Sequence, residues 1–253
     1  MAVVLHTVSV VIPARNEAST IEAIVRPLVA LARDGRGAQL HEVIVVDDGS
    51  TDDTAAVAAA AGAMVIDATD GPGKGAAMWN GVAEATGDIV VFCDADLEEF
   101  DPRFVTRLAD GLRAAGDQFV LVKADYERAG EGGRVTELAA RPVLQLLHPH
   151  LAHISQPLGG EYAATRAALE QVPFVRGYGV EMGLLIDLSR RFGVEAVGQV
   201  DLGVRRHRNR PLSALGPQAR EVLSVALARA GVAGISVEEL PPLAHRRRPR
   251  RLA

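Results

Sequence analysis

The feature that most constrains the fold is a regular alternation of short apolar runs with helical patterns. Five runs rich in β-branched residues lie at residues 8–12, 42–46, 63–66, 88–93 and 118–122. Continuous apolar runs of this length are typical of strands that are buried on both faces. The segments between them have the patterns of helices. The alternation therefore predicts an α/β fold with a mostly parallel sheet covered by helices on both faces.

The first helix is predicted by four apolar residues at helical spacing: Ile21, Ile24, Val25 and Leu28. Ser19 and Glu22 have the spacing of a capping box, which predicts that the helix begins there. Pro27 lies within the pattern and predicts a kink.

Polar segments follow four of the predicted strands. They are PARNE, DDGSTDD, DATDGPGKG and DADLEEFD, in chain order. Each one alone is typical of an ordinary turn or helix cap. GPGKG lacks the spacing and the terminal Ser or Thr of a P-loop, and DDGS is not a dinucleotide-binding fingerprint. Together they predict a ligand site, because the carboxyl ends of parallel strands meet at one edge of the sheet.

Asp94 and Asp96 stand one residue apart directly after the fourth predicted strand. Two carboxylates this close repel each other unless a positive charge lies between them. A hard divalent cation such as Mg²⁺ or Mn²⁺ binds carboxylate oxygens and keeps other positions for water or substrate phosphates. The pair therefore predicts a site for a divalent metal bound to a diphosphate.

Charge is distributed unevenly along the chain. The net charge is -5 at neutral pH, yet HRRRPRR at residues 245–251 concentrates positive charge near the C-terminus. Such a run is typical of a solvated tail. An arm that binds nucleic acid or an anionic membrane is the alternative.

Cysteine use and the N-terminal residues bear on the cellular compartment. The one cysteine, Cys93, lies in an apolar run, so an internal disulfide is impossible and a reducing compartment is predicted. The first residues have neither the basic opening of a signal peptide nor an apolar stretch long enough to cross a membrane. We therefore predict a cytoplasmic globular protein with no nucleic-acid partner and no stable membrane association.

Four segments, in order, resemble the nucleotide-sugar domain of the GT-A glycosyltransferases: VSVVIPARNE, VIVVDDGSTDDT, GPGKGAAMWNG and DIVVFCDADL. Four later segments resemble the actinobacterial glucosyl-3-phosphoglycerate synthases: GGRVTELAARPVL, QPLGGEYAATR, GYGVEMGLLID and QVDLGVRRHRNRPL. The similarity spans roughly residues 8–230. It implies a Rossmann-like GT-A sheet with a nucleotide-sugar half at 1–124 and an acceptor-binding half at 125–232. Residues 233–253 are not covered by the resemblance, and their charge predicts a basic, flexible tail.

The resemblance also implies a donor site for a UDP-sugar. In it, Lys74 reaches the diphosphate, and Asp47 accepts a hydrogen bond from the uracil N–H, with Asp48 as its neighbour or substitute. Mg²⁺ or Mn²⁺ is bound by Asp94, Asp96 and His207. The residues implied for the donor are Pro13, Ala14, Asn16, Glu17, Asp47, Asp48, Gly73, Lys74, Asp94, Ala95 and Asp96. For His207, a solvated basic loop is the alternative.

The residues implied for the acceptor are Gly133, Arg134, Thr136, Tyr178, Arg208 and Asn209. A glycine N–H, a guanidinium and a hydroxyl near a helix start suit an anion that carries carboxylate and phosphate. Glu181 lies on the apolar face of its predicted helix, so it is expected to be a buried carboxylate in need of a partner, such as sugar hydroxyls. A helix-capping Arg134 and an exposed first-turn Glu181 are the alternatives.

The implied reaction is metal-dependent transfer of glucose from UDP-glucose to 3-phosphoglycerate with retention of configuration, by a homodimer. Asp94, Asp96, Lys74 and Glu181 are its implied catalytic residues. Three alternatives remain at this point: another small anionic acceptor, a polyprenyl-phosphate acceptor, and a sugar-nucleotide sensor without activity.

Overall fold

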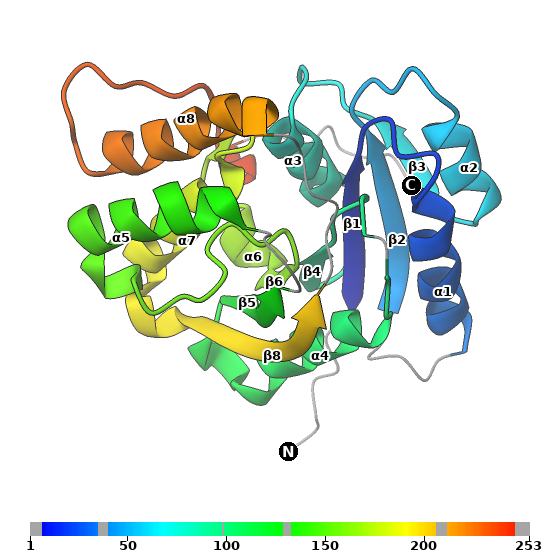
Figure 1. The fold of residues 1–253 in the computed structure, drawn as a ribbon. Coiled ribbons are helices and arrows are strands. Elements are labelled where there is room, and N and C mark those ends of the chain that lie inside the picture. Colours follow the sequence, from blue (N-terminus) through cyan, green and yellow to red (C-terminus); the bar gives the residue numbers. More distant parts are fainter. Residues whose placement is uncertain (1–6, 35–39, 98, 129–132, 206–211, 246–253) are drawn as a thin grey trace.

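A seven-stranded sheet forms the centre of the protein in the computed structural model, which describes residues 7–34, 40–97, 99–128, 133–205 and 212–245 (Figure 1). The strand order is β3-β2-β1-β4-β6-β5-β8. The strands are β1 (Val8–Ala14), β2 (Leu40–Asp47), β3 (Met64–Asp67), β4 (Ile89–Phe92), β5 (Leu121–Arg128), β6 (Tyr162–Thr165) and β8 (Val197–Arg205). Strand β6 is antiparallel to β4 and β5, and the other neighbours are parallel. The predicted mostly parallel sheet is confirmed.

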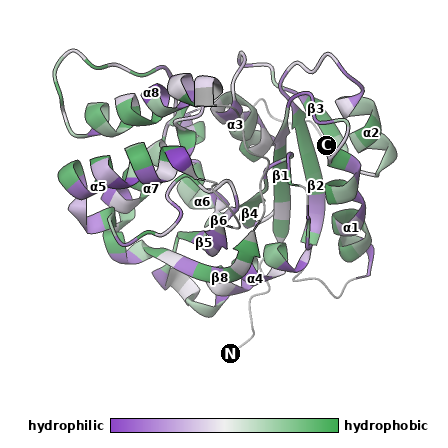
Figure 2. Ribbon diagram, viewed as in Figure 1, coloured by the Kyte–Doolittle hydropathy of each residue, from purple (hydrophilic) through white to green (hydrophobic). Residues whose placement is uncertain are grey.

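Helices cover both faces of this sheet. On one face lie α1 (Ile21–Arg33), α2 (Thr54–Ala60) and α4 (Arg103–Ala114). On the other lie α3 (Lys74–Glu84), α5 (Arg141–Leu147), α6 (Arg166–Leu169), α7 (Val180–Phe192) and α8 (Leu212–Arg229). Side chains of a strand alternate between the faces. Val10 and Ile12 of β1 accordingly enter one core and Val11 the other, and Figure 2 shows β1 coloured as hydrophobic.

Residues 239–245, which the sequence assigned to a flexible tail, are packed against the body of the protein. Strand β9 (Glu239–Leu240) pairs with β7 (Phe174–Val175) in a second, two-stranded sheet. The indole N–H of Trp79 in α3 donates to the carbonyl oxygen of Pro241 at 2.9 Å. Arg229 of α8 forms ion pairs with Asp187 and Glu239. The segment is ordered because Leu240 is buried in the core. Residues 246–253 lie outside the described residues.

Two predictions about strands differ from the structure. Strand β5 begins at Leu121, three residues after the start of the predicted run, because residues 116–118 form a 3₁₀ turn and the ring of Phe119 packs against Gly198. The prediction that all five strands are buried is wrong for β3. This strand lies at the edge of the sheet, and its Met64 is 42% exposed.

The predicted capping box at the first helix does not form. Helix α1 begins at Ile21, and Thr20 occupies the N-cap position without a capping hydrogen bond. The hydroxyl of Thr20 instead donates to the carbonyl oxygen of Ala95 at 2.7 Å, across the sheet edge. Among the described helices, none has the length and apolar character that a membrane span requires.

Candidate active site

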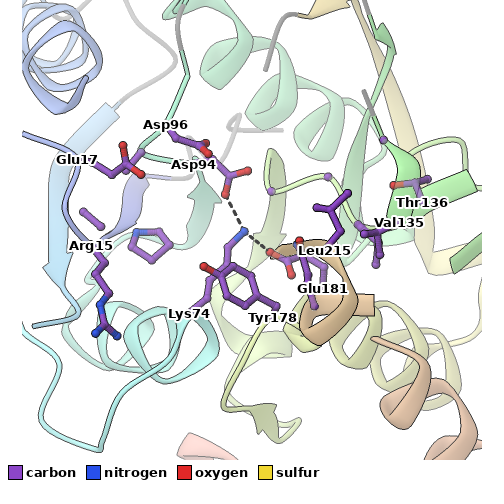
Figure 3. Close-up of a pocket in the computed structure, with 18 of the residues that line it drawn as sticks. Arg15, Glu17, Lys74, Asp94, Asp96, Val135, Thr136, Tyr178, Glu181 and Leu215 are labelled. Carbon is purple, nitrogen blue, oxygen red and sulfur yellow. Dashed lines mark hydrogen bonds and ion pairs between the residues drawn. The ribbon is translucent and has the colours of Figure 1, made fainter. Parts of the chain in front are cut away.

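A pocket opens at the edge of the sheet where the polar segments follow the strands (Figure 3). The predicted residues that line it are Pro13, Ala14, Glu17, Asp48, Lys74, Asp94, Ala95, Asp96, Gly133, Arg134, Thr136, Tyr178 and Glu181. They come from the ends of β1, β2 and β4, the start of α3, the segment before α5, and the start of α7. The expectation that the strand-end segments converge on one site is confirmed, because parallel strands deliver their carboxyl ends to the same edge.

Lys74 joins two carboxylates at the centre of this pocket. Its Nζ lies 2.7 Å from Oδ1 of Asp94 and 2.6 Å from Oε1 of Glu181, as the dashed lines in Figure 3 show. Burial alone would lower the pKa of Lys74, but the charges of Asp94 and Glu181 hold that pKa well above its usual value. Lys74 is therefore a cation at every physiological pH, held between two acids on different elements.

Glycines place Lys74 at the first position of α3. Gly73, the N-cap, has φ 120°, a backbone conformation that favours glycine. A Cβ on Gly75 would fall 1.7 Å from the carbonyl oxygen of Val175, so α3 packs directly on the backbone of β7. The start of a helix favours anions. The helix start and the Lys74 cation therefore both favour a diphosphate here.

The two acids at the end of β2 have different positions. Asp48 lines the pocket and accepts a hydrogen bond from the backbone N–H of Gly73 at 2.9 Å. Burial raises the pKa of Asp48. Asp47 does not line the pocket; its Oδ2 accepts from the backbone N–H of Ser50 at 3.1 Å. The structure therefore favours Asp48 over Asp47 as the acid that meets the donor.

Asn16 was also predicted to contact the donor. In the structure, its hydrogen bonds are with the segment after β2. Its Oδ1 accepts from the backbone N–H of Thr51 at 2.8 Å, and its own backbone N–H donates to the hydroxyl of Ser50. Asn16 has φ 57°, a conformation that asparagine tolerates better than most residues. It thus ties the segment after β1 to the segment after β2. Neither Asn16 nor Gly73 is among the residues that line the pocket.

The residues of the predicted metal site fit a hard divalent cation. Asp94 and Asp96 both line the pocket and offer carboxylate oxygens, the ligand type that Mg²⁺ and Mn²⁺ prefer. A Cβ on Gly160 would fall 2.2 Å from Oδ1 of Asp94, so the bare backbone of this glycine supports the carboxylate. The described residues contain no group of three His, Cys, Asp or Glu placed to bind a metal. The predicted third ligand, His207, lies outside them.

Four of the predicted acceptor residues line the pocket: Gly133, Arg134, Thr136 and Tyr178. Gly133 has φ 79°, and its carbonyl oxygen accepts from the N–H of Glu137, which begins the turn that leads into α5. Thr136 is buried and forms part of the pocket wall. Arg208 and Asn209 lie outside the described residues.

Glu181 is buried in the first turn of α7, which excludes the alternative of an exposed glutamate. The expectation that it needs a partner is met by Lys74, a residue 107 positions away in the chain. No local pattern predicts that pairing.

The pocket also contains residues that the sequence did not single out: Arg15, Tyr126, Val135, Leu158, Gly159, Gly160, Leu215 and Gln218. The glycine pair 159–160 lies in a segment quoted for the family resemblance, so a signal was present. Leu215 and Gln218 come from α8, and only packing of that helix over the pocket reveals them.

Comparison with known proteins agrees with this geometry. The model of the family "Glycosyl transferase family 2" matches residues 9–172. The chain is 46% identical over 248 residues to a glucosyl-3-phosphoglycerate synthase of Mycolicibacterium smegmatis, covering 92% of this chain and 80% of that protein.

Solved structures give the same result. The glucosyl-3-phosphoglycerate synthase of Mycobacterium tuberculosis in complex with Mn²⁺, UDP-glucose and phosphoglyceric acid has a TM-score of 0.87 and 45% identity, covering 94% of this chain and 90% of that one. A complex of that enzyme with Mn²⁺, UDP-glucose and glycerol 3-phosphate has a TM-score of 0.84, 44% identity and coverage of 94% and 91%. The chain belongs to glycosyl transferase family 2 and, within it, to the glucosyl-3-phosphoglycerate synthases.

Proposed function

We propose that this protein transfers glucose from UDP-glucose to 3-phosphoglycerate with the help of Mg²⁺ or Mn²⁺. The main support for the proposal is that Lys74 bridges Asp94 and Glu181 in the pocket at the carboxyl edge of the sheet. It places a cation and two acids where a metal-bound diphosphate and a sugar would meet. The solved relative with 45% identity binds Mn²⁺, UDP-glucose and phosphoglyceric acid.

The donor half of the pocket is suited to a UDP-sugar. Asp48, buried beside the Gly73 N–H, offers an acceptor for the uracil N–H, and Pro13 and Ala14 border the same region. Lys74 and the start of α3 face the diphosphate. Asp94 and Asp96, with His207 as the predicted third ligand, would hold the metal, which when bound neutralises charge on the leaving diphosphate.

The acceptor half is suited to a small anion with two negative groups. The Arg134 side chain can bind a carboxylate or phosphate with two parallel hydrogen bonds. The Gly133 backbone and the Thr136 hydroxyl add donors on the same wall. Arg208 and Asn209 are proposed to contact the acceptor as well, on the evidence of the family resemblance.

Catalysis in this site is electrostatic and positional. As the bond from the anomeric carbon to the diphosphate breaks, negative charge grows on the phosphate oxygen and Lys74 stabilises it. No side chain is assigned as a nucleophile. With retention, the acceptor hydroxyl attacks from the side that the diphosphate leaves, and the departing phosphate oxygen takes its proton. Glu181, held by Lys74, orients the sugar. Proton NMR that shows a β-linked product would contradict this course.

The deciding experiment is a matrix of donors and acceptors. UDP-glucose, GDP-glucose and GDP-mannose are each incubated with 3-phosphoglycerate, glycerate, glycerol 3-phosphate or buffer, and products are identified by mass. The proposal expects glucosyl-3-phosphoglycerate from UDP-glucose. Transfer only to another anion would assign a different acceptor, and UDP-glucose binding without UDP release would indicate a sensor. Lys74→Met is the control for enzyme-dependent turnover.

We also infer a cytoplasmic homodimer. The buried free Cys93 suits a reducing compartment, and the family resemblance supports the dimer. Liposome co-sedimentation tests the polyprenyl-phosphate alternative, since such an acceptor requires a membrane. Light scattering gives the oligomeric state.

A further inference from the structure

Helix α8 packs between two elements that carry predicted acceptor residues. It lies against α5, against the helical turn Thr136–Ala140 that leads into α5, and against α7 (Figure 1). Its own Leu215 and Gln218 line the pocket together with Thr136 and Tyr178. The position of α8 therefore affects the spacing between Thr136 and Tyr178.

Tyr178 is joined to α8 through its backbone. Its N–H donates to Oε2 of Glu221 in α8 at 2.6 Å. Glu221 is not among the residues that line the pocket, whereas Tyr178 is, and Tyr178 is 37% exposed there. Glu221 thus acts on the pocket through the backbone that carries the tyrosine ring.

Two glycines allow α8 to approach this backbone closely. A Cβ on Gly177 would fall 2.1 Å from Oε2 of Glu221, and its three nearest atoms would all belong to the Glu221 carboxylate. A Cβ on Gly179, the N-cap of α7, would fall 2.5 Å from Cγ2 of Val225. Val225 is buried in the core. The turn at 177–179 is therefore packed so tightly on α8 that a side chain at either glycine would push the two apart.

Helix α3 holds the chain just before this turn from another direction. The carbonyl oxygen of Arg176 accepts from the backbone N–H of Ala76 at 3.1 Å. A Cβ on Gly73 would fall 2.5 Å from the same oxygen. These contacts belong to the helix start that carries Lys74 and faces the donor diphosphate. Loss of the Glu221 contact should therefore loosen the α8 side of the turn and leave the donor side in place.

The charge of Glu221 fits a structural hydrogen bond better than a ligand contact. The proposed donor and acceptor are both anions, which a nearby carboxylate repels. A carboxylate does suit the start of a helix, where the dipole and the backbone N–H groups favour negative charge. The Glu221 carboxylate lies at the start of α7 and accepts such an N–H.

We propose that Glu221 is a positioning residue for the acceptor: by accepting the Tyr178 N–H, it fixes Tyr178 at the pocket wall. This inference rests on the proposed function for the assignment of Tyr178 to the acceptor.

Binding of 3-phosphoglycerate to Glu221 variants tests the proposal. Calorimetry in saturating UDP and Mn²⁺ measures acceptor affinity without turnover. Glu221→Ala should weaken this affinity about five- to tenfold, within the range for one lost hydrogen bond, and should change UDP affinity less than about twofold. Glu221→Gln should stay within about twofold of the wild type, because its amide oxygen can still accept from the Tyr178 N–H. Glu195→Ala, which removes an exposed glutamate that is not among the pocket-lining residues, is the control.

Two results of this experiment would overturn the proposal. One is an equal loss of UDP and 3-phosphoglycerate affinity in Glu221→Ala, which would mean a general loosening of the fold. The other is a loss in Glu221→Gln as large as that in Glu221→Ala, which would mean that the hydrogen bond to Tyr178 is not the cause.

Gly177→Ala gives an independent test, because its Cβ would displace the Glu221 carboxylate. Alone, it should weaken acceptor affinity as Glu221→Ala does. In the Glu221→Ala background it should cost less than about twofold, because the atoms in its way are gone. Equal costs in the two backgrounds would show that Gly177 and Glu221 do not act together, and would overturn the proposal.

A readout that needs no substrate follows Tyr178 itself. The chain has three tyrosines, so protein labelled with 3-fluorotyrosine gives three ¹⁹F resonances, and Tyr178→Phe assigns that of Tyr178. Glu221→Ala should shift or broaden this resonance and leave those of Tyr126 and Tyr162 unchanged. An unchanged Tyr178 resonance would overturn the proposal. If the protein uses another acceptor or none, the proposed function fails, and this resonance still decides whether Glu221 positions Tyr178.

Discussion

The backbone of Gly160 touches the carboxylate of Asp94 so closely that a Cβ at that glycine would fall 2.2 Å from Oδ1. Gly160→Ala should therefore displace Asp94 and weaken Mn²⁺ affinity by about 10- to 100-fold, the range typical of changes to the groups that orient metal ligands. Isothermal titration calorimetry with Mn²⁺ and UDP measures this affinity. Gly198→Ala is the matched control: its Cβ would meet the Phe119 ring at 2.5 Å, and neither residue lines the pocket, so it should lower stability and leave metal affinity unchanged.

Neutralising the two acids after β4 should remove metal-dependent turnover. In Asp94→Asn/Asp96→Asn, we expect kcat to fall roughly 100-fold or more, because metal stabilisation of the leaving group contributes several kcal/mol. UDP release is assayed over a Mn²⁺ titration and after chelation. Asp110→Asn, on the exposed face of α4, is the control. Full activity of the double variant under chelation would exclude the metal site.

The neighbouring acids Asp47 and Asp48 should be separable by mutation. Asp48→Asn is expected to weaken UDP binding about tenfold, since a charge-assisted hydrogen bond to the ligand is lost. Asp47→Asn should leave UDP affinity nearly unchanged and lower the melting temperature, because Asp47 holds the Ser50 N–H in the β2–α2 turn. Calorimetry with UDP and thermal unfolding distinguish the two. The reverse ranking would assign the donor contact to Asp47.

The contact between Trp79 and Pro241 should contribute to stability through the C-terminal segment. Trp79→Phe removes the indole donor and should cost about 1 kcal/mol of unfolding free energy, as expected for the loss of a partly buried hydrogen bond. In a chain that ends at residue 238, which lacks Pro241, the same substitution should cost markedly less. Equal costs in both chains would mean that the indole matters only for packing in α3.

His148 should make stability depend on pH. Burial lowers the pKa of His148, with Arg190 and His150 adding to the effect, and its Nε2 lies 3.0 Å from the carbonyl oxygen of Ala226. Because the folded pKa lies below the unfolded value near 6.5, the unfolded state takes up the proton first, and stability falls as pH drops below about 6.5. His148→Gln should reduce this loss in thermal unfolding at pH 7.5 and 5.5. The same pH dependence of stability in the wild type and in His148→Gln would show that His148 does not cause it.

Much of this architecture follows from local sequence. Strands β1, β2 and β4 were predictable because continuous β-branched runs between polar turns are a local pattern that favours buried strands. Asp94 and Asp96 were predictable as a metal site because adjacent like charges at a strand end need a cation. The start of β5 was less predictable. Phe119 is apolar like the strand residues, but it packs against Gly198 of β8 before the pairing of β5 with β8 begins at Leu121.

The parallel sheet, the edge at which its polar segments gather and the acids that a metal needs could all be predicted from the sequence, because they depend on periodicity and on residues close together in the chain. Tertiary packing was needed to show that Glu181 pairs with Lys74, that Asp48 rather than Asp47 lines the pocket, and that the backbone of Gly160 supports Asp94. These relationships join residues on different elements. They depend on packing distances between distant segments, which no local pattern encodes.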